Sequence, residues 1–218
     1  MTLNLNGDLP QWTMGTTAPP DMFRLHDTSA AVHTHAQSTD VPSFDLCGRV
    51  LPYSWEIAVA TADASLGSTD LTALTYRGEG SELCHVLDGP IRVRLWLKGV
   101  AGTYNMHFSN GAETWSYSKP LVLTHADMWT RFDVFVPQIP YPTSGDWFLD
   151  HRVGYTVALV LANGTGSQDE MEKWISGAGL KFGGPQSNFN ATVGNKMKIA
   201  GLRVGDGPLF YEAPDRVK

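Results

Sequence analysis

Two groups of aromatic and acidic residues have the types and spacing that binding of a sugar requires. A sugar offers apolar C–H faces and a ring of hydroxyls, so its site needs exposed aromatic rings with carboxylates or amides beside them. One group follows the Asn110-Gly111 turn at a spacing of two, and the other flanks the turn at 141–147. The candidate carbohydrate-binding residues are Trp115, Tyr117, Tyr141, Asp146, Trp147 and Asp150. The alternative is that these rings belong to the core or to subunit contacts.

Cleavage of a glycan is a second chemistry that the acidic residues would allow. It needs two carboxyl groups about 5 to 5.5 Å apart in retaining enzymes, or about 6.5 to 9.5 Å apart in inverting enzymes. Glu79 with Glu82, and Asp146 with Asp150, are the candidate pairs. Both pairs lie in hydrophilic turns, where solvated carboxylates are usual, and the sequence contains no G-x-S-x-G motif. We therefore predict a protein without catalytic residues, not an enzyme.

Histidine and cysteine spacing gives little support for a metal or redox centre. His33 and His35 would share one side of an extended strand, and three copies around a threefold axis would supply six nitrogen ligands. An isolated H-x-H pair is more often plain surface, so we predict no metal and no cofactor. Cys47 and Cys84 are 37 residues apart, which fits neither a CxxC pair nor a zinc knuckle. Two free thiols are expected, with a disulfide as the alternative.

Composition excludes some partners and indicates the fold class. The 218 residues carry a net charge of −6 and no basic run, which argues against nucleic acid as a partner. The first ten residues lack the pattern of a secretory leader, and no apolar run of about 18 residues occurs, so no membrane partner is expected. Charged residues make up only 17% of the chain, and 22 Gly and 13 Pro interrupt it often. Long surface helices are therefore unlikely to form, which favours β-structure.

Alternation of apolar and polar residues predicts the strands that would position these side chains. The pattern is an all-β, antiparallel sandwich with strands at 91–98, 104–108, 113–118, 129–136, 153–161 and 196–204. Residues 153–161 are apolar at almost every position, which indicates a central strand. The asparagine and glycine at 110–111 predict a type I′ hairpin. Between 163 and 195 we expect one short helix at 168–174 and a hidden short strand.

The distribution of these strands and of the prolines divides the chain into three predicted segments. Residues 1–50 are rich in Pro, Thr and Ser and predict an extended N-terminal arm with at most short strands. Residues 51–206 form the expected sandwich, and 207–218 a C-terminal tail.

Five fragments in a fixed order carry a resemblance to a known family. They are NGD and QW within 6–12 with GTT at 15–17; IRVRLWLKG at 91–99 with GTY at 102–104; MWTRF at 128–132 with VFVP at 134–137; GDWFL at 145–149; and Trp174, NF at 188–189 and IAGLRV at 199–204. Together they resemble the jelly-roll modules of bacteriophage tail fibres and virion spikes, which are similar in fold to carbohydrate-binding modules. Asp21-Met22-Phe23-Arg24 and Arg203 depart from the family pattern, which puts the family's subunit contacts or its orientation in the virion in doubt here.

The resemblance implies a jelly roll and a structural role in a virion. The expected function is that of a short fibre, spike or decoration protein that contacts host-surface polysaccharide without cleaving it. Its partners would be further copies of the chain, most simply in a trimer, other virion proteins and the polysaccharide. It would be made in the bacterial cytoplasm and displayed on the virion surface. The alternatives are a purely architectural cement or adaptor, which would use Arg92, Arg94 and Lys98 as a subunit interface, and a capsule-degrading hydrolase or lyase.

Overall fold

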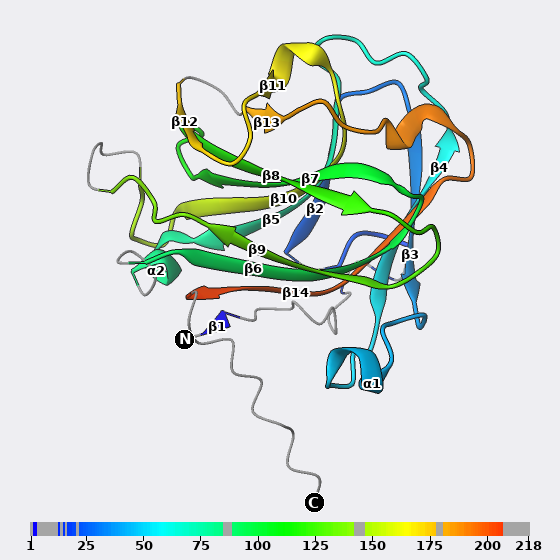
Figure 1. Cartoon of the computed structure of the whole chain (residues 1–218), viewed down its shortest axis with the longest axis horizontal. Helices are drawn as coiled ribbons and strands as arrows, with labels where there is room; N and C mark the ends of the chain where they lie inside the picture. The colour runs from blue at the N-terminus through cyan, green and yellow to red at the C-terminus, as the bar shows by residue number, and fades with distance from the viewer. Residues whose placement is uncertain are drawn as a thin grey trace, which may run out of the picture.

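Two antiparallel β-sheets pack face to face and enclose the main hydrophobic core (Figure 1). The computed structural model describes residues 2–3, 13, 15, 17–20, 22–84, 89–141, 147–177 and 181–206. The architecture is an antiparallel jelly-roll β-sandwich, as the sequence predicts. No helix in the described ranges is long and apolar enough to cross a membrane.

The first sheet has the order β3-β4-β14-β6-β9, with β1 paired to β14 as well. Its strands are β1 (Thr2–Leu3), β3 (Val32–Ser38), β4 (Ser54–Thr61), β6 (Ile91–Gly99), β9 (Thr130–Val136) and β14 (Lys196–Asp206). Strand β14 lies between β4 and β6, so segments far apart in the sequence form the middle of this sheet.

The second sheet has the order β12-β8-β7-β10-β5-β2. Its strands are β2 (Phe23–Asp27), β5 (Leu71–Glu79), β7 (Gly102–Asn110), β8 (Trp115–Leu123), β10 (Val153–Asn163) and β12 (Trp174–Ser176). The predicted central strand is confirmed, because β10 lies between β7 and β5 and is buried along nearly its whole length.

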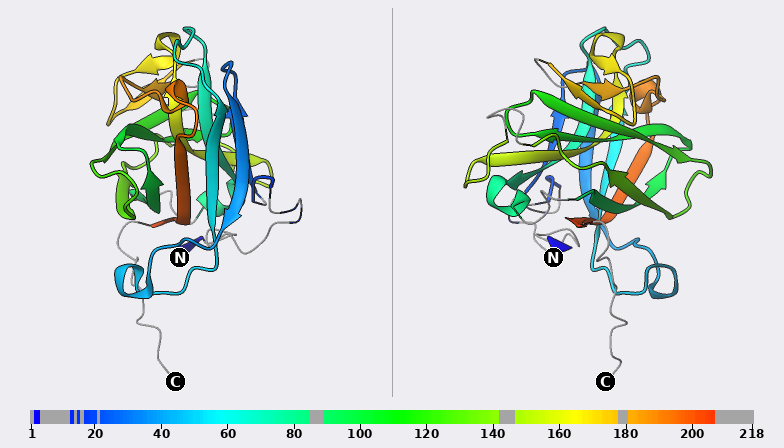
Figure 2. Two further views of the ribbon diagram at one scale, coloured as in Figure 1. Left: turned by 90° about the vertical axis from the view of Figure 1, so that its right-hand side faces the viewer. Right: turned by 60° about the vertical axis from the view of Figure 1, so that its left-hand side comes forward.

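Short elements close the ends and cover part of one face. Strands β11 (Gln168–Asp169) and β13 (Phe182–Gly183) form a small parallel pair. The helices are α1 (Phe44–Cys47), α2 (Gly80–Leu83), and the 3-10 turns η1 (Thr165–Ser167) and η2 (Phe189–Ala191). Helix α1 projects beyond the end of the sandwich in every view (Figure 2).

Strand β6 illustrates how the sequence pattern produces burial on both sides. Ile91, Val93, Leu95 and Leu97 face the main core and are fully buried. The opposite face is not open to solvent, because Trp96 packs there against Cys47, Leu51 and Ala200. The segment that contains α1 therefore covers the outer side of the first sheet.

The N-terminal boundary expected at residue 50 lies inside the sandwich. Strand β2 pairs with β5 at one edge of the second sheet, and β3 pairs with β4 at one edge of the first. Strand β2 contributes to the core, since its Phe23 contacts Trp55 of β4 edge to face at 5.9 Å. The segment 1–50 therefore contains two strands of the sandwich. The predicted tail at 207–218 lies outside the described residues.

Two local predictions are wrong. The helix expected at 168–174 is replaced by the strands β11 and β12, joined by a turn in which Glu172 has φ 65°. The hairpin between β7 and β8 exists, but Gly111 does not take the positive φ of a type I′ turn. Instead Asn110 Oδ1 accepts from the backbone nitrogens of Thr114 and Trp115, both at 2.9 Å, and closes a wider loop.

Candidate functional site

Two rings of the predicted aromatic site belong to the core. Tyr117 and Trp147 are each only 4% exposed. Between them lies Trp174, whose ring centroid is 5.7 Å from that of Tyr117 and 5.6 Å from that of Trp147. The Trp174 Nε1 donates to the backbone oxygens of Pro137 and Gln138 at 3.3 and 3.1 Å. Neither Tyr117 nor Trp147 presents a ring face to a ligand, which corrects the expectation drawn from their spacing.

The other four predicted residues have different surroundings. Trp115 is half-buried against the same core, whereas Tyr141 is 41% exposed. Asp150 is exposed and forms an ion pair with Arg152 at 2.9 Å, and hydrogen bonds from Arg152 lower the pKa of its carboxyl. Asp146 lies outside the described residues. The structure therefore does not assemble the six predicted residues into one exposed platform.

The carboxylates considered for glycan cleavage are engaged in local contacts. Tyr155 Oη donates to Glu82 Oε2 at 2.8 Å, and Glu79 Oε2 accepts from Ser81 Oγ at 3.3 Å and lies 3.5 Å from His151 Nδ1. Burial raises the pKa of Glu82, the hydrogen bond from Tyr155 opposes this, and the charge of Glu79 adds to it. Glu82 thus anchors α2 to the buried phenol of β10.

Both histidines of the H-x-H pair point into the protein. His33 Nε2 lies 2.9 Å from Asn190 Oδ1, and its Nδ1 lies 2.8 Å from Asp27 Oδ2. His35 Nδ1 accepts from Trp55 Nε1 at 3.2 Å, and burial followed by the charge of His33 lowers the pKa of His35. Within the described ranges, no group of three or more His, Cys, Asp or Glu residues is placed to hold a metal ion.

The two cysteines are free thiols in different surroundings. Cys47 is buried at the end of α1, and Cys84 is exposed directly after α2. The expected free thiols are therefore observed, although only Cys47 is buried.

Basic residues on the outer side of the first sheet are paired within the chain. Arg92 and Arg94 of β6 both donate to Oδ1 of Asp133 on the neighbouring strand β9, at 3.1 and 2.7 Å. Lys98 donates to Asp40 Oδ2 at 2.7 Å. These contacts join β6 to β9 and to the segment that follows β3.

The outer face of the second sheet offers a different surface, because small side chains line its central strands. Ala73 and Ala158 project there from β5 and β10, and Phe182 of β13 packs over them. Threonines occupy the next outward positions, at Thr75 and Thr156. Such short side chains leave a depression between the longer residues at its borders.

The floor and borders of this depression come from five elements. Its lining residues are His26, Leu71, Ala73, Thr75, Arg77, His107, Glu113, Thr156, Ala158 and Phe182. His107 lies under Phe182, with ring centroids 4.6 Å apart, and burial lowers the pKa of His107 to about 3. Its Nδ1 lies 3.3 Å from Ser118 Oγ. The floor is therefore neutral at physiological pH, and the charged groups stand at the rim.

Next to the depression lies a hollow that we call the arginine hollow, lined by Met22, Arg24, Arg77 and Val153. Its volume is about 220 Å³. Arg24 is opposite Thr75 in the pairing of β2 with β5, so Arg24 and Arg77 are diagonal neighbours on the same face. Both side chains are exposed, and among the described residues neither guanidinium has an ion-pair partner.

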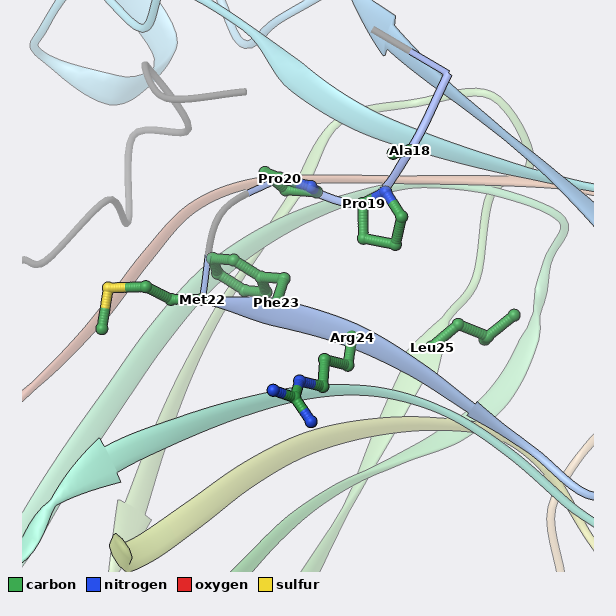
Figure 3. Close-up of a pocket in the computed structure, with 7 residues that line it drawn as sticks. All are labelled: Ala18, Pro19, Pro20, Met22, Phe23, Arg24 and Leu25. Carbon is green, nitrogen blue, oxygen red and sulfur yellow. The ribbon is translucent and has the colours of Figure 1, made fainter. Parts of the chain in front are cut away.

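A third hollow extends the surface past the free edge of β2 (Figure 3). It has a volume of about 490 Å³ and is lined by Ala18, Pro19, Pro20, Met22, Phe23, Arg24 and Leu25. Met22 and Arg24 also line the arginine hollow, and Arg77 connects that hollow to the depression. The three hollows therefore adjoin one another and form a path across β2 and β5, of which the depression itself holds only about 20 Å³.

Sequence reasoning identified none of this surface as a site. The alternation of 23–27, in which Arg24 and His26 are exposed and Phe23 and Leu25 are not, is the signal that would have marked an outward-facing polar row. The pairing of β2 with β5 brings Arg24 beside Arg77 across more than fifty residues of sequence. That register is set by the whole sandwich, so spacing alone could not supply it.

Comparison with known proteins adds a weak likeness in overall shape. No family model matches the chain, and no curated protein matches its sequence. A family 11 carbohydrate-binding module from Clostridium thermocellum, solved with a β-1,3-1,4-mixed-linked tetrasaccharide, is 10% identical with a TM-score of 0.44, over 88% of this chain and 94% of that one. A family 4 carbohydrate-binding module is 11% identical with a TM-score of 0.46, over 94% and 100%.

The N-terminal cellulose-binding domain of a Cellulomonas fimi β-1,4-glucanase is similar to the same extent. It is 12% identical with a TM-score of 0.43, over 88% of this chain and 93% of that domain. Likenesses at this level of identity and overlap assign no function, so the site rests on its own geometry.

Proposed function

We propose that this chain is a non-catalytic glycan-binding protein, and that the path formed by the three hollows on the second sheet is its binding surface. The observation that carries the proposal is that these hollows share residues and run across two strands as one extended surface. A polysaccharide is an extended ligand, and an open path accommodates it without enclosing its ends. A deep closed pocket would instead suit a small molecule.

The side chains along the path suit the chemistry of a sugar. Pro19 and Met22 supply apolar surface for C–H groups, and Arg77 and Glu113 supply donors and acceptors for hydroxyls. Arg77 is carried by β5, so the backbone of this donor is fixed in the packed sandwich before a ligand binds. Preorganisation of this kind lowers the entropic cost of binding.

Display on a virion is the biological setting that we propose, based on the order of the five sequence fragments. In this setting the chain is a short fibre, spike or decoration protein on the surface of a tailed phage, assembled as a homo-oligomer, most simply a trimer. A weak sugar contact becomes useful adhesion when many copies are displayed together, since tethered sites bind at high effective concentration.

The segment around α1 supports attachment to other virion proteins. Phe44, Leu46 and Val50 are large apolar residues that remain exposed there, with Val50 79% exposed. Phe44 and Leu46 lie on α1, which projects beyond the end of the sandwich (Figure 1), and Val50 follows α1 in the chain. Contiguous exposed apolar side chains are typical of a surface that another protein covers.

Affinity electrophoresis through gels that contain one polysaccharide each tests glycan binding. The panel includes neutral and acidic polysaccharides and the capsule of a candidate host. Thr75→Tyr fills the depression from β5 and should abolish retardation, whereas Thr34→Tyr, on the outer side of β3 in the opposite sheet, should not. No retardation by any polysaccharide, or equal retardation of both variants, would contradict the proposal.

Separate measurements test the setting and the alternatives. Antibody labelling of intact particles should place the chain on the virion surface, and light scattering should give the mass of a trimer. New reducing ends after incubation with a bound polysaccharide would favour the hydrolase alternative. Particle labelling without any glycan binding would favour the architectural one.

A further inference from the structure

We infer that the arginine hollow recognises an acidic group on the glycan, a carboxylate or a sulfate ester, so that the protein selects acidic over neutral polysaccharides. This inference rests on the proposed function and narrows it to a ligand class. The juxtaposition that carries it is Arg24 of β2 beside Arg77 of β5 in one 220 Å³ hollow.

The charge of the hollow is the first argument. Among the residues that the structure describes, its lining has two guanidinium groups and no carboxylate, although the whole chain carries a net charge of −6. By contrast, Arg92 and Arg94 are held by Asp133, and Arg152 is held by Asp150. Like charges on diagonal positions of neighbouring strands repel each other. An anion between Arg24 and Arg77 would remove this repulsion.

The geometry of the guanidinium group is the second argument. Its planar fork of N–H donors matches a carboxylate or sulfate with two parallel hydrogen bonds, which a hydroxyl cannot reproduce. Arg24 extends from β2 toward β5, along the sheet surface, and does not fold back over Pro20 or Leu25 (Figure 3). Met22 and Val153 complete the walls of the hollow with apolar groups that suit the ring of a sugar.

Acidic side chains lie close to the hollow and would repel a negative charge placed beside them. The acidic group of the ligand must therefore lie in the hollow itself. Glu113 lines the adjoining depression, and Glu79 follows Arg77 on the same face of β5. Glu79 is already engaged by Ser81 and His151. None of the described residues that line the three hollows is an exposed aromatic, which fits the same conclusion, because stacking is the usual means of holding a neutral sugar.

A matched pair of ligands tests this inference directly. Polygalacturonate, alginate and hyaluronate would each be compared with its carboxyl-reduced form, which keeps the chain and linkage but replaces every carboxylate by a primary alcohol. We expect at least tenfold tighter binding to one or more of the acidic forms than to the matching reduced form. Binding to that acidic form should weaken as NaCl rises from 50 to 300 mM, because salt screens exposed charges.

Variants then assign the selectivity to the two arginines. Arg24→Gln combined with Arg77→Gln should lose at least tenfold in affinity for the acidic form. The double lysine variant, Arg24→Lys with Arg77→Lys, should fall between this and the wild type, because it keeps the charge and loses the fork. Lys173→Gln combined with Lys196→Gln lowers the net charge equally and lines none of the three hollows, so its affinity should stay within twofold.

The outcomes separate the inference from the function on which it rests. Equal binding to acidic and reduced forms, no binding to any acidic form, or an unchanged affinity of the double glutamine variant would overturn the inference. Neutral polysaccharides that bind the wild type but not Thr75→Tyr would overturn it too, while leaving the proposed glycan binding intact. A circular dichroism melting curve of each variant verifies that it is folded.

Discussion

Trp129 Nε1 donates a 3.1 Å hydrogen bond to Asp40 Oδ1, which ties the start of β9 to the segment between β3 and α1. The other carboxylate oxygen accepts from Lys98 and Lys198 at 2.7 and 2.6 Å. One acidic side chain thus joins three parts of the first sheet to the covering segment. Burial opposes ionisation of Asp40, but the hydrogen bonds from Lys198, Lys98 and Trp129 outweigh it and lower its pKa from 3.8 to about 2.

Asp40 should therefore stabilise the fold above pH 4 and lose this contribution as the pH falls from 3.8 to about 2. The folded state holds the carboxyl ionised where the unfolded state is protonated, so acid favours unfolding. Because Asp40 is partly exposed, we expect about 1 kcal/mol at pH 7, less than the full shift implies. Urea titrations of the wild type and Asp40→Asn across this pH range measure the difference.

The control for Asp40 is Glu170→Gln, which removes an exposed carboxylate paired only with Lys173 across one turn. Its stability should change by less than about 0.5 kcal/mol. An Asp40→Asn variant as stable as the wild type at pH 7 would contradict the assigned role of this carboxylate.

His107 predicts a second and separate acid sensitivity. Burial holds its pKa at about 3, against 6.5 for an exposed histidine. The unfolded chain therefore binds a proton that the folded chain does not, and the free energy of unfolding should fall as the pH drops below 6.5, by up to about 1.4 kcal/mol per pH unit. His107→Gln should flatten the stability profile between pH 6 and 4, where Asp40 stays ionised.

An NMR titration measures the His107 protonation state without relying on a variant. Its ring signals should not shift between pH 7 and 4.5. Titration of the His107 signals near pH 6 in the folded protein would contradict the prediction.

Trp147 should contribute to stability and not to ligand binding. Truncation of a buried tryptophan removes a large apolar surface and leaves a cavity, so Trp147→Ala should cost about 3 to 5 kcal/mol in unfolding free energy. Trp147→Phe should cost less, because an aromatic ring still contacts Trp174. Tyr141→Ala is the exposed aromatic control and should stay within about 0.5 kcal/mol. A stable Trp147→Ala with reduced glycan binding would restore the role expected from the sequence.

Gly78 of β5 is required by the close approach of Tyr155. A Cβ at position 78 would overlap the phenol ring of Tyr155, which is itself held by Glu82 and stacked on Phe108 at 5.5 Å. Gly78→Ala should therefore destabilise by about 3 kcal/mol. Combined with Tyr155→Leu, the same change should cost less than half as much. Gly89→Ala is the control, since nothing lies within 4 Å of the added methyl group.

Local alternation was enough to locate the long strands. Residues 91–98 carry aliphatic side chains at every second position because one face must enter the core, and residues 153–161 are apolar at almost every position because β10 is buried on both faces. The small strands β2 and β3 were not placed, since the prolines around them resemble an arm and their partners lie elsewhere in the sequence. Edge position is a property of the sheet order, which the segment alone does not encode.

The site was harder to predict than the fold, for two physical reasons. Tyr117 and Trp147 have the chemistry of a sugar platform, but a side chain type does not reveal whether its face points into the sandwich. Arg24 and Arg77 are unremarkable in the sequence, and only the β2–β5 register makes them neighbours. Composition predicts the fold class, whereas the pairing of strands that are distant in the sequence determines which residues become neighbours on the surface.

The position of β14 between β4 and β6 has a consequence for synthesis on the ribosome. The two flanking strands are translated long before their shared partner, so the first sheet cannot close until residues 196–206 have emerged. Until then β4 and β6 present unpaired edges that can join to strands of another nascent chain. Premature termination before β14 should yield insoluble fragments, and chaperone binding during translation should end only when this strand is released.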